Sequence, residues 1–289
     1  MSFILLIGNA TLDIANSVDH YPVEDEKIRA VGQWVSTGGN AANTAKVLAA
    51  HSHRCDLCAV IAQDKHGDQI ADDLAEQGVG LDWSIRCAST SPTSYITLNQ
   101  QNASRTIVHY RDLPELEAHD FTRIPVNHYD WLHFEGRNVT ALRQMLVYAR
   151  ENVFDQPLSL EIEKPHAGVE ELIPLVDVGM FPRTYAQHQG FNDAESFLRD
   201  RQARHGKVWM TCTWAEQGAW AIDQLGVVFH APALAVEHVV DTVGAGDVFN
   251  AGLIHALVTG MLLEEALHYA VQLAGRKVQQ RGFAGLFPN

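Results

Sequence analysis

A glycine-rich segment that leads into an aspartate is the part of this sequence best suited to phosphoryl-transfer chemistry. The run VVDTVGAGDVFNAG (239–252) carries an apolar strand end through Gly244, Ala245 and Gly246 into a helix that begins near Asp247. Small residues leave backbone N–H groups unpaired at a helix N-terminus, where the helix dipole also favours negative charge. The pattern predicts an anion hole for a phosphoryl group and a general base in Asp247. The structural alternative is an N-cap aspartate in a glycine-rich turn.

A second segment, STGGNAANTAKVLA (36–49), carries amides suited to binding a sugar. Its glycine pair, which ends in Gly39, predicts a tight turn, and the helix that follows places Asn40 and Asn43 three residues apart on one face. From there the two amides can hydrogen-bond vicinal hydroxyls. A plain helix start with asparagine caps is the structural alternative.

Several other kinds of site are excluded by what the sequence lacks. It contains no G-x-x-x-x-G-K-[ST] of a Walker P-loop and no G-x-G-x-x-G of a dinucleotide-binding site. It also lacks the nucleophile elbow of serine hydrolases and the H-E-x-x-H of metalloproteases. The CDLC pair (55–58) is interpreted as part of a buried strand, whose odd spacing points the two thiols to opposite faces. The histidines show no metal-ligand spacing, and HSH (51–53) is interpreted as a polar helix end.

The elements that must position these residues alternate between apolar strands and helices, which is typical of a mostly parallel α/β sheet with helices on both faces. The predicted core strands are FILLIG near Phe3, DLCAVIA near Asp56, WLHFEG near Trp131, LSLEIE near Leu158, VDVGMF near Val176 and KVWMTC near Lys207. The predicted helices cover residues 41–51, 140–151, 193–204, 245–259 and 264–279. The sequence therefore predicts a single α/β domain over residues 1–289.

Two stretches, residues 13–35 and 93–111, depart from that rhythm. They hold the short β-rich segments DIANSVD, IRAVGQWV, SYITLN and RTIVHY, and the turn-like QQNAS joins the last two. Because open α/β sheets bind ligands at the carboxyl ends of their strands, a small sheet inserted there would form a lid over the site. Decorative surface hairpins are the alternative.

Composition limits the partners of this chain. Asp and Glu number 35 against 21 Lys and Arg, and the resulting formal charge of −14 disfavours binding to nucleic acid or to an anionic membrane surface. No run approaches the roughly 18 apolar residues of a membrane span, and no signal peptide is predicted. We therefore expect a soluble, cytoplasmic protein that acts on small molecules.

The segments GGNAANTA and DTVGAGD, in this order and separation, resemble those of the ribokinase-like family of small-molecule kinases, the pfkB carbohydrate kinases. Within that family the sequence is most similar to the ketohexokinase (fructokinase) branch. Further fragments carry the likeness over nearly the whole chain: LD at 12–13, YPVEDEKIR from Tyr21, ASRTI from Ala103, HFEGRN from His133, EIEKP from Glu161, WAEQGA from Trp214 and AGRKVQQRGFAG from Ala274.

The resemblance implies a three-layer ribokinase-like core with a β lid, and a homodimer formed through that lid. It also implies transfer of the γ-phosphoryl group of ATP to a sugar hydroxyl, at position 1 of a ketohexose in this branch. ATP, Mg²⁺ and a monovalent cation such as K⁺ are the implied cofactors. The alternatives are another acceptor, such as ribose, a sugar acid or a nucleoside, and a non-catalytic sugar or nucleotide sensor on the same fold.

Carried over residue by residue, the resemblance makes Asp247 the catalytic base and the segment 244–246 the anion hole. The positions that match sugar contacts are Asp13, Asp25, Gly39, Asn40, Asn43 and Arg105. Those that match the polar cluster beside the phosphate path are Glu135 and Arg137, and those on the nucleotide side are Trp214, Glu216 and Gly218, with Gly244 and Gly246.

The residues themselves agree with several of these roles. Asp13 and Asp25 are acceptor groups at the two ends of a predicted lid strand pair, where they can orient a sugar through its hydroxyls. Arg105 follows the lid turn and can fold over the transferring phosphate as a charge clamp. Glu135 follows the apolar WLHF strand, at the sheet edge where sites form. A wall against adenine is the role considered for Trp214, with simple core packing as the alternative.

One motif of the family is missing. Many ribokinase-like kinases carry an Asn-x-x-Glu after the strand that here reads VDVGMF, and it helps to organise the water around magnesium. This chain has Pro182 to Gln187 at that place and no Asn-x-x-Glu there. Glu163 in EIEKP is the candidate for part of that role.

Overall fold

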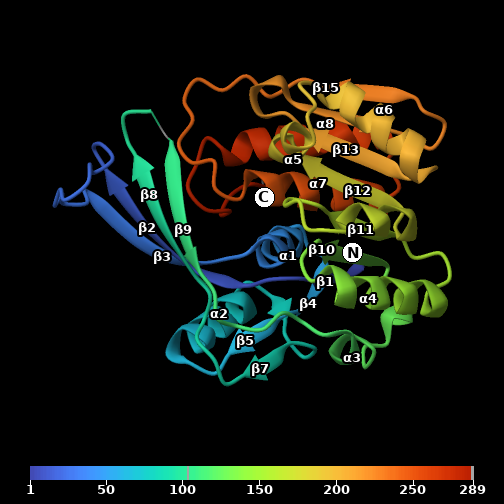
Figure 1. Ribbon diagram of the computed structural model, residues 1–289, viewed down its shortest axis with the longest axis horizontal. Coiled ribbons are helices and arrows are strands. Elements are labelled where there is room, and N and C mark those ends of the chain that lie inside the picture. The colour runs from blue at the N-terminus through green and yellow to red at the C-terminus, as the bar shows by residue number, and fades with distance from the viewer. Residues whose placement is uncertain (103, 288–289) are drawn as a thin grey trace.

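A nine-stranded sheet runs through the centre of the molecule in the order β15-β14-β13-β12-β11-β10-β1-β4-β6 (Figure 1). The computed structural model describes residues 1–102 and 104–287; Ala103, which opens the ASRTI segment, lies outside them. The parallel strands are β1 (Phe3–Ile7), β4 (Arg54–Cys58), β6 (Val79–Gly80), β10 (Trp131–Glu135), β11 (Leu158–Glu161), β12 (Val178–Pro182) and β13 (Trp209–Thr213). Two antiparallel strands, β14 (Ala219–Ile222) and β15 (Val228–Ala231), extend one edge.

Helices cover both faces of this sheet. One face carries α1 (Asn40–Ala50), α2 (Lys65–Glu76), α7 (Ala245–Val258) and α8 (Leu263–Lys277). The other carries α3 (Ala118–Phe121), α4 (Val139–Asn152), α5 (Arg183–His188) and α6 (Ala194–His205). Short 3₁₀ turns lie at Val126–His128, Val169–Leu175 and Ala215–Gln217, and a separate strand pair joins β5 (Val60–Ala62) to β7 (Ile85–Cys87). The α/β architecture expected from the sequence is confirmed.

The side chains of one strand pack into two separate hydrophobic cores, because neighbouring residues along a strand point to opposite faces of the sheet. In β1, Leu5 and Ile7 pack with α4 and α6, whereas Ile4 and Leu6 pack with α1 and α7. The CDLC strand behaves in the same way, since Cys55 and Cys58 lie in different cores as free, buried thiols. Burial raises the pKa of both thiols, which keeps them protonated and supports the structural interpretation of this pair.

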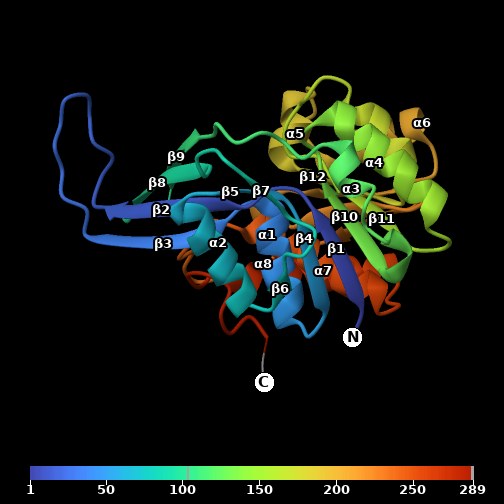
Figure 2. The same cartoon turned by 90° about the horizontal axis from the view of Figure 1, so that it is seen from below.

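A second sheet of four strands, called here the small sheet, projects from the core (Figures 1 and 2). Its order is β3 (Gly32–Gly38), β2 (Thr11–Val18), β8 (Thr93–Asn99) and β9 (Arg105–Tyr110). Strands β2 and β8 are parallel, and the two outer pairs are antiparallel. The separate sheet formed from two distant segments was expected, although β3 begins at Gly32, after the IRAV part of the predicted strand.

Within the described residues, no helix has the length and apolar character needed to cross a membrane.

Candidate active site

Asp247 lies buried in the first turn of α7, with its carboxylate held by helix α1. The side-chain amide of Asn43 donates to Asp247 Oδ2 at 2.7 Å. The hydroxyl of Thr44 donates to the backbone carbonyl of Asp247 at 3.4 Å. The two glycine-rich motifs of the sequence therefore meet, although 204 residues separate this pair along the chain.

Burial sets the proton affinity of Asp247. Desolvation raises the pKa of this carboxyl from 3.8 to about 7, and the charges of Glu163 and Glu135 act in the same direction. The hydrogen bond from Asn43 and the charge of Lys46 oppose the rise. A carboxylate of this basicity is still ionised in a large fraction at neutral pH, which suits a general base.

The N-terminus of α7 is open beside this carboxylate. Gly244 precedes the helix with φ of 77°, and a Cβ there would come within 2.8 Å of the Phe283 ring. The amide of Ala245 donates to the Thr242 carbonyl at 3.3 Å, whereas those of Gly246 and Asp247 find no acceptor among the described residues. Chain neighbours and its own helix aside, no described atom lies within 4 Å of where a Gly246 Cβ would be. These two amides have no acceptor among the described residues, and Gly246 is exposed, so this helix N-terminus can bind an anion.

A buried lysine fixes the loop that leads into α7. Lys277, at the end of α8 and 1% exposed, donates from Nζ to Asp241 Oδ2 at 2.9 Å and to the Asp241 carbonyl at 3.1 Å. Asp241 Oδ1 in turn accepts from the Val243 amide at 2.9 Å. These contacts hold the loop in place before any anion binds, as electrostatic stabilisation requires.

Asn40 joins α1 to the edge of the central sheet. Its Nδ2 donates to Glu161 Oε2 at 3.2 Å and to Glu163 Oε2 at 3.1 Å. Burial and the neighbouring negative charges of Asp247, Glu135 and Glu163 raise the pKa of Glu161 well above its ordinary value. Glu135, Glu161, Glu163 and Asp247 thus form one group, the carboxylate cluster, at the carboxyl ends of β10 and β11.

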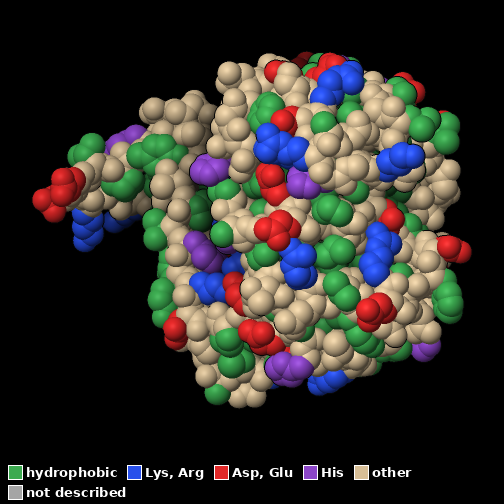
Figure 3. Space-filling view, turned by 45° about the vertical axis from the view of Figure 1, so that its right-hand side comes forward, with side chains coloured by type: hydrophobic (Ala, Val, Ile, Leu, Met, Phe, Trp, Pro, Cys, Tyr) green, Lys and Arg blue, Asp and Glu red, His purple; other side chains and the backbone are tan. Residues whose placement is uncertain are grey.

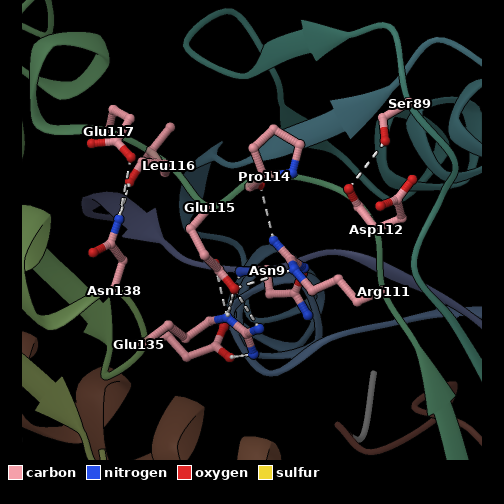
Figure 4. Close-up of polar contacts among 11 residues, drawn as sticks. Asn9, Ser89, Arg111, Asp112, Pro114, Glu115, Leu116, Glu117, Glu135 and Asn138 are labelled. Atoms are coloured by element: carbon pink, nitrogen blue, oxygen red, sulfur yellow. Dashed lines mark hydrogen bonds and ion pairs between the residues drawn. The ribbon is translucent and has the colours of Figure 1, made fainter. Parts of the chain in front are cut away.

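Glu135 is held in a closed ring of polar contacts that reaches the base of the small sheet (Figure 4). Arg137 contacts Glu135 at 3.4 Å and pairs with Glu115 at 2.7 Å, and Glu115 in turn pairs with Arg111 at 3.2 Å. Arg111 Nη1 donates to Asn9 Oδ1 at 2.7 Å, and the backbone N–H of Asn9 donates to Glu135 Oε2 at 2.9 Å. Arg111 directly follows β9, and Asn9 lies two residues before β2. The ring therefore fixes two of the chain segments that connect the base of the small sheet to the core.

Asp13 faces the same region from β2. Gly38 makes room for it, since a Cβ on Gly38 would come within 2.1 Å of Asp13 Oδ2. Burial raises the pKa of Asp13, and hydrogen bonds from Ser94 and Thr11 together with the charge of Lys46 oppose the rise. Figure 3 shows charged and histidine side chains gathered where the small sheet meets the core.

Other predicted residues lie nearby. Gly39 caps α1 with φ of 98° and passes so close to Asn9 that a Cβ would come within 2.4 Å of the Asn9 carbonyl oxygen. Arg105, at the start of β9, donates to the Thr242 hydroxyl, so the small sheet touches the loop that precedes the anion hole.

The structure separates Asp25 from this group. Asp25 is exposed, with φ of 65°, in the loop 19–31 that projects beyond β2 and β3 (Figure 2). Within one chain the β2–β3 hairpin holds Asp13 near its base and Asp25 in its projecting loop, so a contact of Asp25 with the sugar stays a prediction.

The nucleotide-side residues lie on the turn after β13. Trp214 is only 4% exposed and packs in the core with α4 and α6, so its ring is a poor wall for adenine. Glu216 is exposed and pairs with Arg183 at 3.2 Å. Gly218, with φ of 91°, lets the turn close, since a Cβ would come within 2.0 Å of the Ala231 carbonyl oxygen. A nucleotide contact by this turn stays a prediction.

The described residues of the site offer few side-chain ligands for Mg²⁺. The described residues contain no group of three or more His, Cys, Asp or Glu side chains placed to hold a metal ion. Mg²⁺ that arrives with a nucleotide needs only one or two carboxylates, because water and phosphate oxygens complete its shell. Glu163, which is exposed at the edge of the carboxylate cluster, fits that role.

Several residues of the site were missed in the sequence. They are Asn9, Lys46, Arg111, Glu115, Glu161 and Lys277. Two left a signal: Lys46 and Lys277 each interrupt an apolar helix face, and a lysine there must find an acceptor. The others act through contacts between distant segments, which no local pattern announces.

Comparison with known proteins shows the family of this fold. The description "pfkB family carbohydrate kinase" matches residues 1–288. Ketohexokinase of Mus musculus is 36% identical over 294 residues, which cover 98% of each chain. Ribokinase of Arabidopsis thaliana is 24% identical over 300 residues, covering 99% of this chain and 78% of that protein.

The structural comparison agrees. The structure of Arabidopsis thaliana ribokinase complexed with ribose and ATP superposes with a TM-score of 0.82 at 22% sequence identity, covering 100% of this chain and 96% of that one. A likeness at this identity concerns the fold, and it matches both the large sheet and the small one.

Proposed function

The chain belongs to the pfkB family of carbohydrate kinases, and we propose that within this family it transfers the γ-phosphoryl group of MgATP to the 1-hydroxyl of a ketohexose such as fructose. The single observation that carries the mechanism is the buried Asp247 carboxylate, which Asn43 holds beside the free N-terminus of α7. The likeness to mouse ketohexokinase supports the choice of acceptor.

Asp247 acts as the general base. It accepts the proton of the acceptor hydroxyl while the new bond from that oxygen to the γ-phosphorus forms and the bond from phosphorus to the ADP oxygen breaks. The carboxyl ends the step protonated, and its raised pKa makes it basic enough to take the proton.

The free amides of Gly246 and Asp247 stabilise the negative charge on the transferring group. They are fixed before the reaction by the Lys277 contacts to Asp241, so no reorganisation is needed when charge develops. Arg105 lies at the tip of the small sheet, from which it can add a positive charge.

The acceptor sugar is held by amides and carboxylates of α1 and β2. Asn43 Oδ1 is buried and has no hydrogen-bond partner among the described residues, so it can accept a hydrogen bond from a sugar hydroxyl. The Asp13 carboxylate is acceptor-only, and we place it on a neighbouring hydroxyl. Bound Mg²⁺ would neutralise phosphate charge, with Glu163 as the residue that would hold it through water. K⁺ is proposed from the family likeness alone.

The small sheet is proposed to serve as a lid and as the contact between two copies of the chain. Its outer face carries the cross-strand row Val35, Ile14, Tyr95 and Val108. Tyr95 and Val108 are 50% and 65% exposed, and apolar side chains of this size in one row suit a partner surface. We also propose that the protein acts in the cytoplasm.

The test is ADP release by the purified protein with MgATP and KCl against fructose, tagatose, psicose, ribose, gluconate derivatives and adenosine. Turnover with fructose that disappears in Asp247→Asn, while fructose still binds by calorimetry, supports the proposal. Turnover with another acceptor moves the substrate and keeps the mechanism. Nucleotide binding without turnover on any acceptor would point to a sensor and refute the catalytic role of Asp247.

A further inference from the structure

A polar row crosses the inner face of the small sheet beside Asp13. The strand registers pair Asp13 with Ser36 on β3 and with Ser94 on β8, and pair Ser94 with His109 on β9. Residues paired directly across strands share one face of a sheet. Ser36, Asp13, Ser94 and His109 therefore point to the same side, opposite to the apolar row that contains Tyr95 and Val108.

That side is the crevice above the carboxylate cluster. Three cationic side chains from the base of the small sheet and the sheet edge, Lys164, Arg137 and Arg111, lie near enough to His109 to influence its charge, as does Asp13. His109 is exposed, whereas Ser94 is 9% exposed and Asp13 is largely covered. The row thus runs from a covered end at Asp13 to an open end at His109.

The hydroxyl of Ser94 joins His109 to this row. His109 Nδ1 lies 3.2 Å from Ser94 Oγ, and either atom of this pair can donate the hydrogen bond. When Nδ1 carries the proton of the neutral ring, Nε2 is a lone-pair acceptor, and no described residue hydrogen-bonds to it.

We propose that His109 is a specificity-determining residue, whose Nε2 accepts a hydrogen bond from a hydroxyl of the acceptor sugar beyond the one bound by Asp13. Adjacent strands lie about 4.8 Å apart, so two strand spacings set Asp13 and His109 roughly 10 Å apart at the backbone. Side chains that lean inward from those positions can hold two hydroxyls at the two ends of one hexose. This inference rests on the proposed function and extends it to the remote end of the substrate.

The charge state of His109 supports this role. Desolvation, and then the charges of Lys164, Arg137 and Arg111, lower the pKa of the ring below its ordinary 6.5, and Asp13 alone acts the other way. The neutral ring with a free Nε2 is therefore the form present at pH 7.5. Because this pKa lies below 6.5, the ring takes up a proton only in more acidic solution, and Nε2 then changes from acceptor to donor.

The experiment compares wild type, His109→Leu and His109→Asn with d-fructose and its 3-, 4-, 5- and 6-deoxy derivatives. We expect His109→Leu to raise KM for fructose by roughly 10- to 100-fold with kcat changed less than about threefold. For one deoxy sugar, which lacks the hydroxyl that His109 binds, KM should stay nearly the same in both proteins. His109→Asn, which keeps an acceptor, should recover part of the affinity. Thr106→Ala, on the same strand but the opposite face, is the matched control.

A structural role would not reproduce this pattern. In wild type, KM for fructose should also rise as pH falls through the titration of His109, and this rise should be absent in His109→Leu. A uniform loss on all five sugars, or an unchanged preference among them, would overturn the inference while leaving the kinase proposal intact. Absence of turnover and of calorimetric binding by wild type with every sugar of the wider panel would instead overturn the proposed function, and the role of His109 with it.

Discussion

Replacing Asp247 by asparagine should stabilise the protein while abolishing turnover. Asp247 is buried, and its pKa is raised from 3.8 to about 7, so its carboxylate binds a proton more strongly in the folded protein than in the unfolded chain. A carboxyl group whose pKa is raised on folding lowers the free energy of unfolding as the pH rises from the unfolded pKa to the folded pKa. Above pH 7 the cost is fully present.

The magnitude follows from the size of the shift. About three pH units at about 1.4 kcal/mol each give an upper limit of about 4 kcal/mol at pH 8. At pH 5, where the folded carboxyl is mostly neutral, the same reasoning gives about 2 kcal/mol. Asparagine keeps an acceptor for the Asn43 amide and carries no charge, so it escapes the cost at both pH values.

The assay is urea unfolding of wild type and Asp247→Asn at pH 5 and pH 8, with Asp155→Asn at an exposed position as the matched control. We expect the advantage of Asp247→Asn to be larger at pH 8 than at pH 5, by about 2 kcal/mol, and the control to show no such difference. An advantage that is absent, or that is the same at both pH values, would show that burial does not raise the basicity of this carboxylate.

Three further predictions concern the surroundings of the site. Asn43→Ala removes the 2.7 Å hydrogen bond to Asp247. Since a hydrogen bond to a charged group is worth about 1.5–3 kcal/mol, the acid limb of the pH profile of kcat/KM should move up by about one to two pH units. Asn40→Ala, at a residue that does not touch Asp247, should leave the acid limb in place. Glu115→Gln removes the carboxylate that contacts Arg111 and leaves Arg137 paired with Glu135 alone. It should lower the free energy of unfolding by about 1–3 kcal/mol, against less than about 0.5 kcal/mol for Glu195→Gln in the exposed pair with Arg199. Burial and the neighbouring His51 and His53 lower the pKa of His255 to about 4, so stability should fall between pH 6.5 and 4, and less steeply in His255→Phe when both are followed by urea unfolding.

The sequence predicts the parallel part of the fold well because each of its elements announces itself locally. Strand β1 is an unbroken apolar run buried on both faces, and α7 follows directly from a glycine turn. The antiparallel edge β14–β15 was not predicted, because strands of four residues are too short to show a clear alternation of apolar and polar residues. Helix α2 was also missed, since its sequence is rich in Asp and its amphipathic face holds few apolar residues.

The site was predictable where a motif carries its own geometry. Asn43 and Asp247 sit in motifs whose chemistry requires them to face a common ligand, and the structure joins them directly. Glu115 and Arg111 gain their meaning only from contacts with Arg137 and Asn9 on other segments. The two ends of the β2–β3 hairpin looked equivalent in sequence, yet the hairpin carries Asp25 away while Asp13 stays at the core.

The order of residues along the chain has a consequence for the protein during its synthesis. Asp13 is synthesised well before its partner strand, and the parallel pairing of β2 with β8 waits until residue 99 has emerged. The carboxylate proposed as the base and the lysine that fixes its loop come later still, with α7 and α8, after every strand of the central sheet. A chain that stops before α7 can therefore form much of the sheet and still lack both residues, so we expect it to be inactive.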